Sequence, residues 1–311
     1  MSTAFIFPGQ GSQYVGMGAA LKERFSQAAE VYAEADDALG FSLTDLILSG
    51  PVERLTETEN TQPAILTCAV AYLRVLHAHG VSAQFSAGHS LGEYAALVAN
   101  GALSFSSAVR LVRLRGRFMQ AAVPLGVGTM AAVLMLDGAR VEALCEQVST
   151  PDSRVEPAGY NCPGQVACAG HVDAVERLEA AVGQSGGMAK RLTVSAPFHS
   201  SLLNKAGEDL GEALASVVIH PLSFPYVANV DAQLVTDPSG VKQRLIEQVM
   251  KPVRWEQSMA VMKEQGVERF IEVGPGKTLA GLMRKIDRKA NVISVDDGKT
   301  IDKAFDALLA G

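Results

Sequence analysis

A serine between two glycines, set between an apolar run and a helix-like run, constrains this chain more than any other feature. The motif Gly-His-Ser-Leu-Gly occupies residues 88–92, after a predicted strand at 83–87 and at the start of a predicted helix at 91–98. The glycines permit a sharp strand-to-helix turn that would strain a larger residue. Such a turn exposes the Ser90 hydroxyl at a helix N-terminus, where N–H groups and the helix dipole favour an oxyanion. An ordinary glycine-rich turn with a capping serine fits the same five residues.

Strands and helices alternate along most of the chain. Strands are predicted at 3–7, 224–227 and 269–273, and helices at 19–39, 64–79, 105–123, 202–215, 241–250, 256–265 and 279–288. This alternation predicts an α/β fold with a parallel sheet that is covered on both faces.

The order of elements changes between residues 126 and 196. Strands at 129–136, 155–160, 165–169 and 189–194 and helices at 138–148 and 172–184 follow the order β-α-β-β-α-β. That order is typical of a ferredoxin-like unit. We therefore expect an inserted ferredoxin-like small domain at 126–196, and a large α/β-hydrolase-like domain with a parallel sheet from 1–125 and 197–311.

Composition and charge exclude several classes of protein. The chain has 311 residues, 48% hydrophobic and 19% charged, as in an ordinary globular enzyme, and its net charge of −6 gives no reason to expect nucleic acid as a partner. No apolar stretch approaches the roughly 20 residues that cross a bilayer, and residues 1–7 lack the features of a secretory signal. Four cysteines without a C-x-x-C pair indicate free thiols rather than a metal site. We expect a cytoplasmic enzyme with no membrane partner.

A serine nucleophile needs a general base, and His199 is the best placed of six histidines. The other five lie at a helix end, at turns or beside Ser90 itself: His77, His79, His89, His171 and His220. His199 lies where the predicted small domain returns to the large one, and catalytic clefts commonly lie between domains. A residue at a helix start with no chemical role is the alternative. The 112 residues that follow His199 argue against a standard esterase, whose histidine lies close to the C-terminus.

Arg115 is unusual because it lies on the apolar side of its predicted helix. Its neighbours three and four positions away are all apolar: Leu111, Val112, Phe118 and Met119. Arg110, Arg113, Arg117 and Gln120 instead form a predicted solvated stripe. A buried guanidinium is costly without an anionic partner. Either a distant Asp or Glu pairs with Arg115, or the carboxylate of a substrate does.

Seven motifs carry a resemblance to a known family. They are Phe-Pro-Gly-Gln-Gly-Ser-Gln at 7–13, Thr-Gln-Pro-Ala at 61–64, Gly-His-Ser-Leu-Gly-Glu at 88–93, Arg-Leu-Arg-Gly at 113–116, Asn-Cys-Pro-Gly-Gln at 161–165, Pro-Phe-His-Ser at 197–200 and Glu-Val-Gly-Pro-Gly at 272–276. Over residues 4–295 the chain resembles the malonyl-CoA:acyl carrier protein transacylases of bacterial fatty acid synthesis. It resembles the acyltransferase domains of polyketide synthases less closely.

The resemblance implies roles for particular residues. It implies Ser90 as the acylated nucleophile, His199 as its base, Gln248 as the residue whose carbonyl orients the histidine, Arg115 as the partner of the malonyl carboxylate, Gln62 and Asn161 as pocket residues, and the N–H groups of Gln10 and Leu91 as the oxyanion hole. Gln62 fits a plain position near a helix start nearly as well. His89 belongs to the motif without a role that we can assign.

The resemblance also implies a reaction and a partner. Malonyl-CoA would acylate Ser90, and the phosphopantetheine thiol of acyl carrier protein would then take the malonyl group, with no metal or cofactor. Carrier proteins are acidic, so docking needs a local basic patch. Lys190, Arg191, Arg284 and Lys285 are candidates, although each also fits a solvated surface.

Three functions remain open at this point. They are malonyl transfer, a serine hydrolase or thioesterase that leaves Arg115 unexplained, and a non-catalytic carrier-binding protein. Within malonyl transfer, the carrier could serve fatty acid synthesis, a polyketide pathway in trans or malonate decarboxylase.

Overall fold

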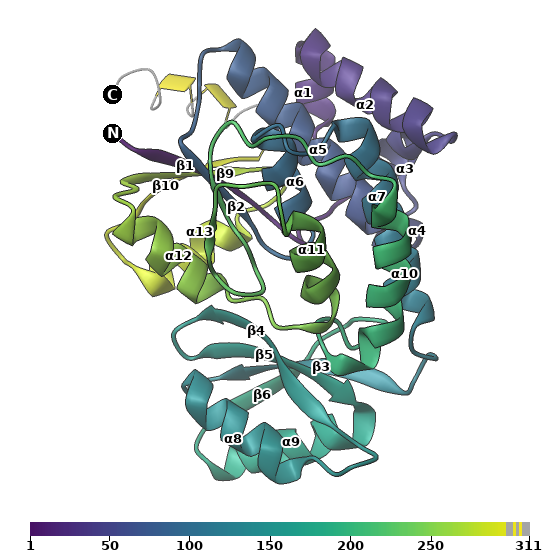
Figure 1. Ribbon diagram of the computed structural model, residues 1–311, viewed down its shortest axis with the longest axis vertical. Helices are drawn as coiled ribbons and strands as arrows, with labels where there is room; N and C mark the ends of the chain where they lie inside the picture. The colour runs from purple at the N-terminus through teal and green to yellow at the C-terminus, as the bar shows by residue number, and fades with distance from the viewer. Residues whose placement is uncertain (297–300, 303–304, 307–311) are drawn as a thin grey trace.

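The computed structural model describes residues 1–296, 301–302 and 305–306 of the chain (Figure 1). Residues 297–300, 303–304 and 307–311, the end of the predicted 197–311 segment, lie outside the described residues. The fold is mixed α/β and contains two sheets.

The larger sheet is mainly parallel. Its six strands lie in the order β10-β9-β1-β2-β7-β8, and only β8 runs antiparallel to its neighbour. The strands are β1 (Thr3–Phe7), β2 (Phe85–Gly88), β7 (Tyr226–Val227), β8 (Leu234–Val235), β9 (Arg269–Val273) and β10 (Asn291–Val295). β1 and β9 are buried along their whole length, as expected of parallel strands with both faces covered.

Helices cover both faces of this sheet (Figure 1). They are α1 (Ala19–Arg24), α2 (Ser26–Leu39), α3 (Leu43–Ser49), α4 (Val52–Thr56), α5 (Thr58–Ala78), α6 (Gly92–Ala99), α7 (Phe105–Ala121), the 3-10 turn η1 (Ser201–Leu203), α10 (Asn204–Ala215), α11 (Val241–Met250), α12 (Trp255–Glu264) and α13 (Thr278–Ile286). Alternate side chains of β1 point to opposite faces. Phe5 and Phe7 join a core with α5, α6 and α7, whereas Ala4 and Ile6 join a core with α12 and α13.

The second sheet lies beside the first and is antiparallel throughout. Its elements are β3 (Gly128–Leu134), α8 (Gly138–Val148), β4 (Val155–Cys162), β5 (Gln165–His171), α9 (Val172–Gln184) and β6 (Met188–Arg191), and its strands lie in the order β4-β5-β3-β6. α8 and α9 pack on one face over a separate apolar core (Figure 1). Backbone hydrogen bonds between Tyr160 and Val253 and between Val253 and Ala158 join β4 to the segment before α12.

Several predicted elements have different bounds in the structure. The predicted helix at 19–39 is two helices, because Phe25 is extended at φ −124° and ψ 122°. The predicted helix at 64–79 begins earlier, at Thr58, with Pro63 inside its buried length. α3, α4, β8 and β10 were not expected, since they are short and lack a clear apolar period. Over the described part of the chain, no helix is long and apolar enough to cross a membrane.

Candidate active site

Ser90 lies in a tight turn between β2 and α6. Its backbone is left-handed, at φ +53°, which costs energy for a residue with a side chain. A Cβ on Gly88 would lie 1.9 Å from the Gly92 carbonyl, and one on Gly92 would lie 2.2 Å from the Phe7 carbonyl. Both positions therefore require glycine, because the backbone passes too close to them for a side chain to fit. The turn leaves Ser90 only half-buried.

Asn229, which the sequence analysis missed, holds this turn in place. Its Oδ1 accepts from the Ser90 N–H at 2.7 Å, and its Nδ2 donates to the Gly88 carbonyl at 2.6 Å. The side chain thus bridges Gly88 and Ser90, on either side of His89. The signal in the sequence was a polar residue just after β7, the strand beside β2, where parallel strands present functional groups.

The Ser90 hydroxyl and the His199 imidazole are in direct contact. Ser90 Oγ lies 2.7 Å from His199 Nε2, and His199 Nδ1 lies 2.7 Å from the main-chain carbonyl of Gln248. An Nδ1–H that donates to this carbonyl leaves Nε2 unprotonated, so that it can accept the serine proton. His199 is also left-handed, at φ +60°, so both partners have strained backbones.

The His199 ring is neutral when the site is empty. Burial, and next the positive charge of Arg115, lower the pKa of His199 from 6.5 to about 3. A base with a low pKa stays available at neutral pH. It gains a charge only as it takes the proton of Ser90.

Arg115 on α7 is buried beside this pair and forms no ion pair within residues 1–296. Its Nη1 donates to Gln62 Oε1 at 2.8 Å, and its Nη2 donates to Gln248 Oε1 at 2.9 Å and to Ser90 Oγ at 3.2 Å. Its Nε has no partner among the described residues. Of the two expectations for Arg115, direct pairing with a distant Asp or Glu is therefore wrong.

The arginine stripe on the other face of α7 differs in part from the expectation. Arg110 and Arg117 are exposed, as predicted. Arg113 is instead half-buried, because its guanidinium lies 4.3 Å above the Phe41 ring and donates to Asn60 Oδ1 at 2.9 Å. Arg113 is therefore not a purely solvated residue.

Glu93 is a buried carboxylate that contacts the site residues Gln248 and Asn229, although the sequence analysis gave it no role. Its Oε2 accepts from the Gln248 side-chain amide at 2.7 Å and from the Asn229 N–H at 3.2 Å. Gln248 Nε2 also donates to the Ser90 carbonyl at 2.9 Å. Burial raises the pKa of Glu93 to about 7. Its place in the motif at 88–93 was the signal that could have identified it.

Two backbone N–H groups, one next to Ser90 in the chain and one in the loop after β1, have no acceptor among the described residues. Neither Gln10 nor Leu91 donates its N–H to an acceptor in the described part of the chain. The loop that carries Gln10 abuts the serine turn, since a Cβ on Gly9 would lie 2.5 Å from the His89 carbonyl. Free N–H groups near a nucleophile can stabilise a developing oxyanion.

Asn161 lies near the site but contacts His89 rather than Ser90. Its Oδ1 lies 2.9 Å from His89 Nε2, and the His89 ring lies 5.6 Å from the Trp255 ring. His89 therefore points away from the Ser90 hydroxyl. The contact places Asn161, at the end of β4, against the larger sheet.

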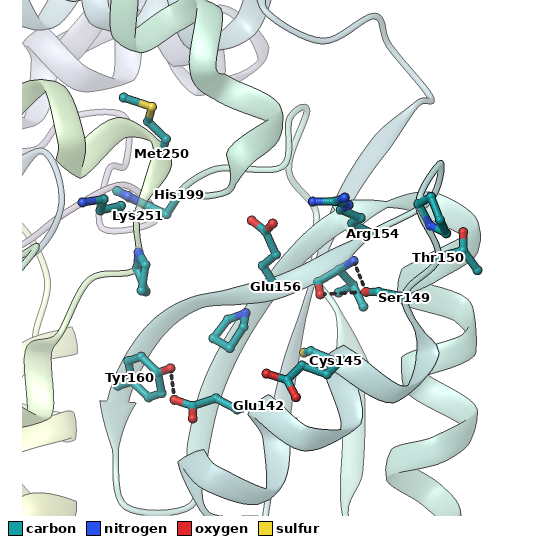
Figure 2. A pocket seen from close by; sticks show the side chains of 15 residues that line it. Glu142, Cys145, Ser149, Thr150, Arg154, Glu156, Tyr160, His199, Met250 and Lys251 are labelled. Carbon is teal, nitrogen blue, oxygen red and sulfur yellow. Dashed lines mark hydrogen bonds between the residues drawn. The ribbon is translucent and has the colours of Figure 1, made fainter.

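A cavity of about 680 Å³ reaches His199 from the side of the second sheet. Figure 2 shows Arg154, which precedes β4, and Glu156 of β4 on one side, and His199, Met250 and Lys251 on the other. Glu156 accepts two hydrogen bonds from Ser201, which fixes the segment that follows His199. Within the described ranges, no three His, Cys, Asp or Glu side chains are grouped as a metal site would require.

Comparison with known proteins decides the family. The family described as acyl transferase domain matches residues 4–299. The chain belongs to the acyl transferase family. Malonyl CoA-acyl carrier protein transacylase of Bacillus subtilis is 44% identical over 308 residues, which cover 98% of this chain and 96% of the relative.

Solved structures of related proteins support the assignment of this chain to the acyl transferase family. The malonyl CoA-acyl carrier protein transacylase of Clostridium perfringens has a TM-score of 0.97 and 40% identity, with 100% of this chain and 98% of the other covered. A malonyl-transacylase solved in complex with a type II PKS acyl-carrier protein has a TM-score of 0.96 and 39% identity, with 99% and 100% covered.

The predicted docking residues of this acyl transferase differ in whether other side chains of the protein already bind them. Arg191 is held by Glu179 through two hydrogen bonds of 2.8 Å, and Lys285 donates to Gln165 Oε1 at 2.9 Å. Lys190 and Arg284 are exposed and form no ion pair in the part of the chain that the structure describes. Arg191 is therefore the least available of the four.

Proposed function

We propose that this acyl transferase moves a malonyl group from malonyl-CoA to the phosphopantetheine thiol of an acyl carrier protein. The observation that carries the proposal is Arg115, a buried cation with no carboxylate in direct contact, whose Nη2 lies 3.2 Å from the Ser90 hydroxyl oxygen. A thioester held at Ser90 places a malonyl carboxylate within reach of this guanidinium, which binds carboxylates through two parallel hydrogen bonds. The names of the relatives and of the solved carrier complex support the same substrate and partner.

The first half-reaction acylates the serine. His199 Nε2 takes the Ser90 proton as Oγ attacks the thioester carbonyl, and the N–H groups of Gln10 and Leu91 stabilise the oxyanion. The C–S bond then breaks, and the imidazolium returns its proton to the CoA thiolate. The Gln248 carbonyl keeps the ring oriented throughout. The product is a malonyl ester on Ser90.

The second half-reaction reverses these steps with a different thiol. The phosphopantetheine thiol gives its proton to His199 and attacks the ester carbonyl, and Ser90 then recovers the proton as the C–O bond breaks. Gln62 keeps Arg115 in place through its 2.8 Å hydrogen bond, and Asn161 shapes the pocket wall through His89. A ping-pong course follows from a single nucleophile that serves both thiols.

The carrier is proposed to dock on basic residues, with Lys190 and Arg191 as one candidate group and Arg284 and Lys285 as another. Arg284 and Lys285 lie in the last turn of α13, and Lys285 reaches Gln165 at the start of β5, so this part of the surface spans both sheets. Lys190 and Arg191 lie on the edge strand β6. Which pathway the carrier serves is set by the partner, and polyketide synthesis in trans and malonate decarboxylase remain alternatives to fatty acid synthesis.

We also propose a division into two domains. Residues 126–196 are proposed as an inserted ferredoxin-like domain, supported by the β-α-β-β-α-β order, the separate core and both helices on one face. Residues 1–125 and 197–311 are proposed as a hydrolase-like domain, supported by the parallel strands and the serine turn after β2.

Intact-mass measurement tests the proposed function. The protein mixed with malonyl-CoA should gain one malonyl group, and a carrier protein that bears phosphopantetheine should then gain that group. Ser90→Ala should gain none, and a carrier without phosphopantetheine should remain unmodified. A malonyl adduct on Ser90→Ala refutes the nucleophile. Release of malonate with no gain by the carrier favours a serine hydrolase.

A further inference from the structure

Glu93 is the carboxylate linked most directly to Arg115. A single amide separates them, because Gln248 Nε2 donates to Glu93 Oε2 at 2.7 Å while Gln248 Oε1 accepts from Arg115 Nη2 at 2.9 Å. Both Glu93 and Arg115 are fully or almost fully buried. The amide dipole aligns with both charges, so each hydrogen bond strengthens the other.

Where Glu93 is ionised, the site therefore holds one cation and one anion. A malonyl carboxylate that binds Arg115 adds a second anion to the same buried region. Two buried carboxylates beside one guanidinium repel each other, and one of them becomes easier to protonate. Because the malonyl carboxylate contacts the guanidinium directly, Glu93 is the carboxylate that takes up the proton.

The geometry of Glu93 suits this proton uptake. Glu93 Oε1 is buried and has no hydrogen-bond partner within the described residues, whereas Oε2 carries both hydrogen bonds. A proton on Oε1 leaves the contacts of Oε2 to Gln248 and Asn229 intact. The carboxyl group can thus change charge without a rearrangement of the site.

We propose that Glu93 is the counter-charge of Arg115 in the empty enzyme and that it takes up a proton when the malonyl carboxylate binds. Glu93 then acts through Gln248 as a positioning residue that couples acyl-group selection to pH. This inference rests on the proposed malonyl function. Proton uptake by Glu93 is a separate role from the nucleophile and base chemistry of Ser90 and His199.

The groups around Glu93 are consistent with titration near neutral pH. Burial is the main cause that raises the pKa of Glu93 to about 7. Hydrogen bonds from Gln248 and Asn229 lower this pKa, and of the nearby charges Asp231, after β7, raises it while Arg115 on α7 lowers it. Tyr94 on α6 and Tyr226 on β7 also face Glu93, and burial raises the pKa of both phenols, so they remain neutral. Asp231 is paired with Arg244 of α11 at 3.0 Å.

The pH dependence of acyl selection follows from linkage. A ligand that raises the pKa of Glu93 binds more tightly to the protonated form. Malonyl acylation relative to acetyl acylation should therefore fall as pH rises from 6 to 8, by roughly fivefold, the lower end of common coupling between sites. His199, whose pKa is lowered to about 3, does not titrate in this range.

The test compares the two acylation rates by intact mass at pH 6, 7 and 8. The ratio of malonyl to acetyl rates cancels the ionisation of the CoA moiety, which both substrates share. Glu93→Gln should make the ratio independent of pH and keep it at the value that the natural protein has at pH 6. Glu272→Gln is the matched control, because Glu272 is equally buried and accepts hydrogen bonds from Leu279, Ala280 and Ser294. It should leave the fall of the ratio unchanged.

Proton uptake gives a second readout that needs no variant at position 93. Formation of the malonyl ester releases no net proton at neutral pH, so a pH indicator in weak buffer should report uptake when malonyl-CoA acylates the natural protein. Acetyl-CoA should give none. A flat rate ratio in the natural protein, or no proton uptake, overturns the inference. So does a Glu93→Gln variant that lowers malonyl acylation equally at every pH. If the natural protein forms no adduct at all, the proposed function itself fails.

Discussion

At the scale of single residues, the site depends on a few residues with strained backbones or buried charge, which their neighbours hold in place. Ser90 and His199 both have left-handed backbones, and Arg115 is buried without a counter-ion in direct contact. Such arrangements cost stability and persist because neighbouring contacts fix them. Gln248 supplies most of these contacts, since its main-chain oxygen, side-chain oxygen and side-chain nitrogen each serve a different partner.

Replacement of Arg115 tests which group selects the acyl chain. Arg115→Ala should lower malonyl acylation by tenfold to a hundredfold or more, since loss of a hydrogen-bonded charge costs about 1.5–3 kcal/mol. Acetyl acylation should be spared or raised, because a neutral acyl group no longer faces a buried guanidinium. Adduct formation with the two thioesters, followed by intact mass, measures both effects.

Arg117→Ala is the matched control for this prediction. Arg117 lies on the same helix, is exposed, and is 3.5 Å from Glu59. Its loss should leave both rates unchanged. Arg113→Ala is a poorer control, because Arg113 packs on Phe41 and holds Asn60. An equal loss of both activities in a stably folded Arg115→Ala protein contradicts the prediction.

At the scale of elements, the turn between β2 and α6 is positioned by the strands beside β2. β1 lies on one side, and its Phe7 carbonyl accepts from the His89 N–H at 2.9 Å. β7 lies on the other side and leads into Asn229. The serine turn is thus held by backbone and side-chain contacts from two segments far away in the sequence.

Gly88→Ala tests whether close packing at this turn is essential. The added Cβ would lie 1.9 Å from the backbone of Gly92, so the turn must open. We expect acylation to be lost and the protein to be destabilised by more than about 3 kcal/mol, as for severe overpacking. Thermal denaturation and intact mass measure the two effects.

Gly183→Ala is the control for backbone entropy. Gly183 lies in α9, and a Cβ there meets no atom within 4 Å. This change should be neutral or stabilising by up to about 1 kcal/mol, with normal acylation. A Gly88→Ala protein with normal stability and activity would show that the turn can relax.

At the scale of the whole molecule, the two sheets meet where the chemistry is proposed. The edge of β4 is joined by hydrogen bonds to Val253, and the cavity that reaches His199 is lined by α8, by β4 and the loop before it, and by residues 250–252. The proposed docking surface likewise has residues on both parts.

Charge reversal on α13 tests the docking surface. The double change Arg284→Glu and Lys285→Glu should raise the KM for carrier protein by roughly tenfold, mainly through slower association, and the effect should shrink at high salt. Acylation by malonyl-CoA alone should be unchanged. Arg74→Glu on α5 is the control, because Arg74 is exposed like Arg284 and Lys285. It should change neither the KM for the carrier protein nor acylation by malonyl-CoA. An unaltered KM for the carrier in the double variant removes α13 from the docking surface.

The sequence by itself determined the parts of this protein that depend on local patterns. The α/β alternation, the second group of strands and helices between 126 and 196, and the strand–serine–helix turn are readable because apolar period and glycine position act over a few residues. The odd placement of Arg115 on its helix is readable for the same reason. The resemblance to a known family extended this to Gln248, Gln62 and the family itself.

Only the tertiary structure decided how these residues are paired. Asn229 contacts Ser90, and Glu93 contacts Gln248, across gaps of more than a hundred residues, and no local period marks such contacts. That Arg115 meets two glutamine oxygens and not a carboxylate also depends on how α7, α5 and α11 pack. Hydrogen-bond partners of a buried charge are set by close packing of distant segments, which a single sequence does not display.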